Sequence, residues 1–195
     1  DADRAELYAL LGQLRELAGV LDGSIEAYRR AAALTPDPVG RALVLAKRAR
    51  VHQRAGAHRT ALRVVTQARR LLDGADGAEA AAVMVRLDNL IALIRLGQGK
   101  GREAPLGATR AAEGARRIDD LDNLGSALLA SGHALWQLGL PGPGDRIQEA
   151  LEIYEQCADL HGQAVARTNL GVLAFGAGRW SEALEWYRSS RAVLD

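Results

Sequence analysis

The feature that most constrains the fold of this chain is a pattern of small and aromatic residues at fixed offsets. In the stretch Gly23–Pro36, Ser24 and Ala31 flank Tyr28, and a proline closes the segment. A helix that only covers a core accepts large apolar residues at such positions. Small residues at fixed offsets instead let a second helix come close. The pattern therefore predicts helices that pack on one another at set contact points.

The same offsets recur about every forty residues, which indicates an internal repeat. Sliding the last segment back by 39 residues places Gly132 under Gly171 and Trp136 under Phe175. Successive anchors of the repeat lie 37, 43, 40 and 39 residues apart, at Gly12, Ala49, Ala92, Gly132 and Gly171. Periods of this length are typical of solenoids. We predict one array of five units over residues 5–36, 37–73, 78–117, 120–158 and 160–195.

Each unit is predicted to hold two helices joined by a short turn. A glycine is the expected residue where the first helix stops, and the units supply Gly19, Gly56, Gly99, Gly139 and Gly178. Polar residues such as Asp22, Asp145 and Ser181 are expected to cap the second helices. The fold class is therefore all-α, with ten antiparallel helices, about 75–80% helix and no sheet, far above the usual helical content.

These residues resemble the tetratricopeptide repeat (TPR). Its pattern is matched between Ala5 and Pro36 by Tyr8, Leu11, Gly12, Ser24, Tyr28, Ala31 and Pro36, and in the last unit by Leu170, Gly171, Trp180, Ala183 and Tyr187. Departures include Arg167, where an aromatic is usual, and Ala49 and Ala92, which replace the glycine. The longer spacing is similar to the repeat regions of large bacterial transcriptional and signalling regulators. The resemblance implies an α-α superhelix that serves as an interaction scaffold.

The composition favours an intracellular setting. The sequence contains no uninterrupted run of about 18 apolar residues, the length that a membrane span needs. Cys157 is the only cysteine, so no internal disulfide can form. We therefore expect a cytoplasmic protein that does not contact a membrane. The sequence begins at Asp1, and its only methionine is Met84. This leads us to expect a piece of a longer protein.

The charge of the chain is unevenly distributed. The segment Pro38–Leu72 holds nine basic residues and no acidic one, although the whole chain has a net charge of +1. A solvated arginine-rich face is one interpretation, and an acidic protein partner is another. Nucleic acid is a poor fit, because the segment has no aromatic residue on which a base could stack.

Catalytic and metal-binding patterns are missing from the sequence. The glycine-rich stretch Gly97–Gly101 follows a predicted helix and its Lys100 precedes a glycine, so it indicates a turn rather than a phosphate loop. The histidines lack metal-ligand spacing. Cys157 is expected to be a packed small side chain within a helix. We therefore expect no enzyme activity, no metal and no cofactor.

A partner is expected on the concave surface that first helices line in such superhelices. The predicted groove residues are Arg50, Arg86, Asn89, His133, Trp136, Thr168, Val172 and Phe175. Trp136 and Phe175 occupy the same repeat position, so they are expected side by side, although packing between repeats is the alternative. In the best-known groove of this family, Lys and Asn clamp a peptide carboxylate. Ala9 and Gln13 stand where the first such pair would be, so this clamp is not expected.

Three functions remain open at this stage. The leading hypothesis is a non-catalytic protein-interaction scaffold in a bacterial signalling or transcriptional regulator, with an acidic and hydrophobic peptide as partner. The first alternative is a sensor domain that binds a small ligand in the groove. The second is a self-association module, since Tyr187, Val193 and Leu194 in the last repeat are expected to be partly exposed and to support an end-to-end homodimer.

Overall fold

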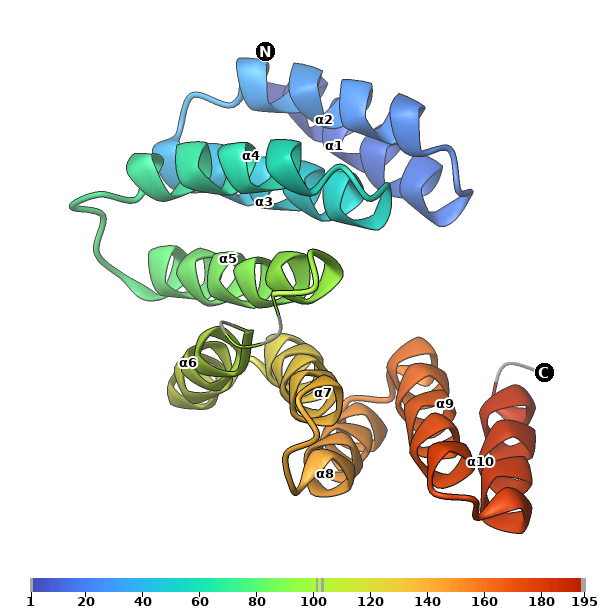
Figure 1. The fold of residues 1–195 in the computed structure, drawn as a ribbon. Coiled ribbons are helices and arrows are strands. Elements are labelled where there is room, and N and C mark those ends of the chain that lie inside the picture. The colour runs from blue at the N-terminus through green and yellow to red at the C-terminus, as the bar shows by residue number, and fades with distance from the viewer. Residues whose placement is uncertain (1, 101, 103, 194–195) are drawn as a thin grey trace. The chain divides into compact units, whose positions relative to one another are not determined.

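The computed structural model describes residues 2–100, 102 and 104–193. These described residues are 82% helical, form ten helices and contain no strand, which confirms the all-α prediction. They divide into two compact units (Figure 1), an N-terminal unit of Asp1–Lys100 and a C-terminal unit of Gly101–Asp195. The boundary falls inside the third predicted repeat. The division into five repeats of one array therefore stays a prediction.

The N-terminal unit contains five helices that pack in chain order. They are α1 (Ala2–Leu17), α2 (Leu21–Leu34), α3 (Pro38–Arg54), α4 (His58–Leu71) and α5 (Ala78–Gly97). Helix α1 packs on α2, α2 on α3 and α3 on α4, while α5 packs on both α3 and α4 (Figure 1). The first two predicted repeats thus correspond to the hairpins α1–α2 and α3–α4.

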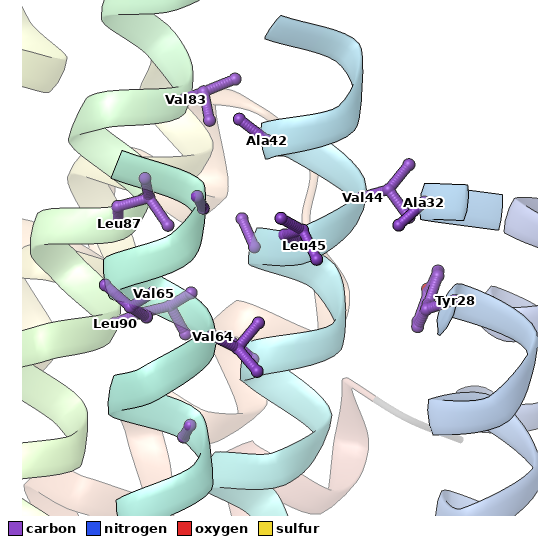
Figure 2. Packing of buried hydrophobic residues seen from close by; sticks show 14 of the residues in the cluster. Tyr28, Ala32, Ala42, Val44, Leu45, Val64, Val65, Val83, Leu87 and Leu90 are labelled. Atoms are coloured by element: carbon purple, nitrogen blue, oxygen red, sulfur yellow. The ribbon is translucent and has the colours of Figure 1, made fainter. Parts of the chain in front are cut away.

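The core of the N-terminal unit is built from medium-sized and small side chains. Figure 2 shows Leu45 of α3 close to the valines of α4, with Leu87 and Leu90 of α5 on the other side. Tyr28 of α2 is the only aromatic side chain among the buried residues of this cluster. Small side chains at the helix contacts let the backbones approach closely, as the repeat pattern predicts.

The C-terminal unit also contains five helices. They are α6 (Ala104–Arg117), α7 (Leu121–Gln137), α8 (Pro143–Gln156), α9 (Leu160–Gly176) and α10 (Trp180–Ala192). Each helix packs on the next, and α7 also touches α9. The fourth and fifth predicted repeats correspond to the hairpins α7–α8 and α9–α10.

The glycines end the first helices as predicted. Gly19, Gly56, Gly99, Gly139 and Gly178 all have a φ between +65° and +75°, the left-handed region that a residue without Cβ adopts at little cost. The backbone N–H of the residue after each glycine donates a hydrogen bond to the carbonyl five residues earlier, for example from Val20 to Arg15 at 2.8 Å. This hydrogen bond satisfies a carbonyl that the helix end leaves open.

The predicted helix caps are wrong. Asp22, Asp145 and Ser181 lie inside the first turns of α2, α8 and α10, and the residues that precede these helices make no side-chain capping bond. Side-chain caps occur instead at first helices: Asp37, Asp120 and Asp159 accept hydrogen bonds from the backbone N–H three residues later. The second helices follow tight glycine turns. Backbone hydrogen bonds already fix the chain in these turns, so a side-chain cap would add less stability there.

The small residues of the repeat are contact points between paired helices. The Ser24 hydroxyl donates to the Gly12 carbonyl at 2.8 Å. A Cβ at Gly12 would lie 2.8 Å from the ring of Tyr28, and a Cβ at Gly171 would lie 2.7 Å from the ring of Tyr187. Each glycine thus leaves room for an aromatic ring of the second helix. This explains why a small residue and an aromatic recur at fixed spacing.

Candidate functional site

The aromatic residues of the predicted groove are exposed on the C-terminal unit. Trp136 on α7 is 45% exposed and Phe175 on α9 is 55% exposed. The ring centroids of Trp136 and His133 are 5.9 Å apart, one turn along α7. Phe175 makes an edge-to-face contact with Trp180 of α10 at 4.8 Å. Both aromatic side chains therefore present apolar surface to solvent, although their ring contacts are with His133 and Trp180.

Two further predicted groove residues lie on α9. Val172 is half-buried. The Thr168 hydroxyl lies 2.9 Å from the Ala164 carbonyl and 2.9 Å from the Ser190 hydroxyl of α10. Ser190 also bonds to the Ala164 carbonyl. Thr168 therefore helps to join α9 to α10, and its hydroxyl is already engaged.

The basic part of the predicted groove lies on the N-terminal unit and centres on a buried acid. Glu16 of α1 is only 4% exposed. Arg50 of α3 donates to both of its carboxylate oxygens, at 3.0 and 2.9 Å, and Arg54 donates at 3.1 Å. The Tyr28 hydroxyl also faces Glu16, at 3.5 Å. Burial and this nearby carboxylate raise the pKa of Tyr28 to about 12.

The Glu16 cluster joins the first helices of the first two repeats. Bidentate pairing of this kind fixes geometry strongly. It also means that a partner's carboxylate would compete with Glu16 for the Arg50 guanidinium. The sequence offers no clear signal for this pair, because Glu16 and Arg50 lie 34 residues apart.

The remaining predicted residues of this unit differ in exposure. Arg86 of α5 is half-buried, whereas Asn89 is 4% exposed and so offers little surface to a partner. Lys47 of α3, which was not predicted, belongs to the same basic group. Burial and the charges of Arg86 and Arg50 lower the pKa of Lys47.

A second apolar surface, which the sequence analysis missed, runs along α1. Leu7, Leu10, Leu14 and Leu17 are each at least half exposed. Their spacing of three, four and three residues places them on one face of the helix. That spacing is the signal that would have found them. We call these four residues the leucine stripe.

The described residues contain no cluster of His, Cys, Asp and Glu that could hold a metal ion. Cys157 is exposed just after the end of α8, so the expectation of a packed cysteine within a helix is wrong. No helix in the described part of the chain is long and apolar enough to cross a membrane. In the last repeat, Tyr187 is 37% exposed and Val193 is half-buried, while Leu194 lies outside the described residues.

The fold is that of TPR-like helical-repeat proteins, which confirms the resemblance read from the sequence. A Rap protein in complex with Competence and Sporulation Factor superposes with a TM-score of 0.85 and 19% identity, covering 97% of this chain and 54% of the other. A signal transduction ATPase (STAND protein) with a TPR sensor, from Pyrococcus horikoshii, has a TM-score of 0.74 and 15% identity, covering 98% of this chain and 29% of the other.

A putative kinesin light chain from Podospora anserina, with nearly identical TPR-like repeats, has a TM-score of 0.62 and 16% identity. The match covers 100% of this chain and 96% of the other. This chain thus spans about half of the Rap protein and less than a third of the STAND protein. No protein-family model and no curated protein sequence matches it. At these identities the likeness concerns the fold.

Proposed function

We propose that this chain is a non-catalytic scaffold that binds a protein or peptide partner, as part of a bacterial signalling or transcriptional regulator in the cytoplasm. The observation that carries the proposal is the exposure of Trp136 and Phe175 at one repeat position on α7 and α9. Large apolar side chains that are exposed at a surface commonly mark interaction sites, and tryptophan is enriched among residues that dominate binding energy.

The solved structures give this proposal its context. The Rap protein is in complex with Competence and Sporulation Factor, and the TPR region of the STAND protein is described as a sensor. The STAND protein is named as a signal transduction ATPase, which supports a signalling regulator as the parent of this chain. Because that TPR region is a sensor, a small ligand remains the alternative occupant of the same surface.

The partner that fits best has an apolar segment and acidic residues. Trp136 and Phe175 would receive the apolar side chains. Lys47, Arg50 and Arg86 on the N-terminal unit would attract the acids, with Arg50 shared with Glu16. Contacts between exposed charges weaken with salt, so a partner whose acids contact these cations should bind less tightly as salt rises.

Selection of peptides from a random display library against the whole chain tests this proposal. We expect enrichment of sequences with an aromatic or aliphatic residue and nearby acids. Arg86→Gln should weaken their binding at 50 mM salt more than at 500 mM, two conditions that differ roughly threefold in screening length. If no peptide is selected, and a parallel calorimetric screen detects binding of a small metabolite, the sensor alternative would be favoured.

Self-association is a second candidate function, and the leucine stripe of α1 favours it. Four leucines on one face of a helix form an apolar strip of the kind that pairs with another helix. The exposed Leu184 and Tyr187 of α10 offer a second apolar face. If these faces meet between copies, the contact is heterologous and the mass should keep rising with concentration. Sedimentation of the wild type and of Leu10→Ser tests this, and a strict monomer at high concentration would exclude it.

A further inference from the structure

A cleft on the N-terminal unit, separate from the predicted groove, is lined by positive charge. It lies between α2 and α4 with α3 beneath and has a volume of about 690 Å³. Its described lining includes four arginines and a histidine but no Asp or Glu: Ile25, Arg29, Arg48, His52, Thr60, Arg63, Val64, Thr66, Gln67 and Arg70. A volume of this size lies within the range of small-ligand pockets.

The cleft and the predicted groove use opposite sides of α3. Arg48 lines the cleft, whereas Arg50 pairs with Glu16. Residues two apart on a helix point about 200° away from each other. A ligand in the cleft therefore would not occupy the surface proposed above for the protein partner.

Most of the arginines in the cleft have no acidic partner. Arg29 forms an ion pair with Glu26 at 2.7 Å. Arg48, Arg63 and Arg70 form none within the described part of the chain. The buried Nε of Arg48 also has no hydrogen-bond acceptor there. Buried donors are normally satisfied, so this guanidinium is free to bind oxygens that enter the cleft.

The charges of the cleft act on one another. Burial, followed by the charges of Arg29 and Arg63, lowers the pKa of Arg48. Burial, Arg48 and Arg63 likewise lower the pKa of His52. Cations from three helices are therefore held close enough to repel each other. An anion between them would relieve this repulsion and gain charge-assisted hydrogen bonds, which are the stronger kind.

We propose that this cleft binds a small organic phosphate with at least two phosphate groups, held by the guanidinium groups of Arg48, Arg63 and Arg70. Two features favour this occupant over a single inorganic ion. The volume exceeds what one phosphate fills, and the free arginines come from both α3 and α4. Arginine suits phosphate because its planar fork can donate two parallel hydrogen bonds. His52 and Thr60 supply neutral polar groups beside them.

Calorimetric titration of the whole chain with inorganic pyrophosphate at 0.15 M salt tests the site. Arg63→Gln and Arg48→Gln should each weaken binding at least tenfold, since hydrogen bonds to charged groups are among the strongest. Arg59→Gln is the matched control. It removes the same charge from α4, one turn from Arg63, but does not line this cleft. It should change the affinity less than twofold.

Three results would overturn the proposal. One is the absence of measurable pyrophosphate binding, and another is an equal loss of affinity in Arg59→Gln and Arg63→Gln, which would indicate only the general field of the arginines. The third is tighter binding of a hexaglutamate peptide than of pyrophosphate that Arg63→Gln weakens and Arg86→Gln leaves unchanged, which would assign the cleft to an acidic segment. Because Arg63 is exposed, its variant stays informative even if Arg48→Gln fails to fold. None of these results depends on the proposed partner surface.

Discussion

Replacing Gly12 with alanine should destabilise the chain, whereas the same change at Gly171 should cost much less. Both glycines hold the same repeat position, and both face the ring of a tyrosine on the paired helix. The two rings differ in their freedom. Tyr28 is 0% exposed and is enclosed by the core, while Tyr187 is 37% exposed at the end of the C-terminal unit.

The magnitude follows from the space around each position. An added Cβ would lie 2.8 Å from the Tyr28 ring and 2.7 Å from the Tyr187 ring, where ordinary contact begins near 3.4 Å. Overpacking of this kind costs about 1–3 kcal/mol, and the better helix propensity of alanine returns about 1 kcal/mol. Because the Tyr28 ring is fully buried and cannot move aside, the overpacking cost should lie in the upper part of this range, about 2–3 kcal/mol, and Gly12→Ala should lose about 1–2 kcal/mol. Gly171→Ala should change stability by about 0–0.5 kcal/mol, because Tyr187 can turn outward.

Guanidinium unfolding followed by circular dichroism measures the difference. Gly144→Ala is the control, because an added Cβ in this first turn of α8 meets nothing within 4 Å. It should leave stability unchanged or raise it by up to about 1 kcal/mol. If Gly12→Ala is as stable as the wild type, the close contact with Tyr28 does not set the requirement for glycine, and the reasoning fails.

Three further changes test other parts of the structure. Ala183→Trp, at a residue that is 2% exposed between α9 and α10, should destabilise by about 1–3 kcal/mol or more, seen as a lower melting temperature. Glu16→Ala should cost about 2–3 kcal/mol in chemical unfolding, less than a fully buried ion pair because its arginine partners are half exposed. The pKa of His52, measured by NMR, should lie below 6.5 and rise in Arg63→Gln. Since folding favours the neutral ring, His52 should make the fold less stable as the pH falls through 6.5.

Much of the fold was predictable because the repeat depends on residues that lie close together in the sequence. A glycine at the end of a first helix and a small residue opposite an aromatic are both recognisable from spacing alone. The predicted caps were wrong, because the side-chain caps lie at first helices rather than second ones; Asp120 and Asp159, two of the actual caps, lie 39 residues apart and so follow the repeat. The division into two units was also not predicted, because the repeat anchors keep their regular spacing through Ala92 and Gly132.

Less of the candidate site than of the fold could be predicted from the sequence. Counting positions along the helices found Trp136 and Phe175, which are exposed. Counting did not reveal that Glu16 engages Arg50 or that Asn89 is buried, because both depend on packing between helices far apart in the chain. The basic segment was recognised, but its arginines divide between two sides of α3 only once the helices are packed.

The affinity of one selected peptide for wild type, Trp136→Ala and Leu184→Ala tests the central claim most directly. Leu184 is a suitable control because it is 48% exposed on α10, close to the exposure of Trp136, but lies on a second helix. We expect Trp136→Ala to weaken binding at least tenfold with an unchanged helical spectrum, and Leu184→Ala to weaken it less than threefold, as hot spots are few. Equal binding by all three proteins, or unfolding of Trp136→Ala, would contradict the assignment of this surface to a partner.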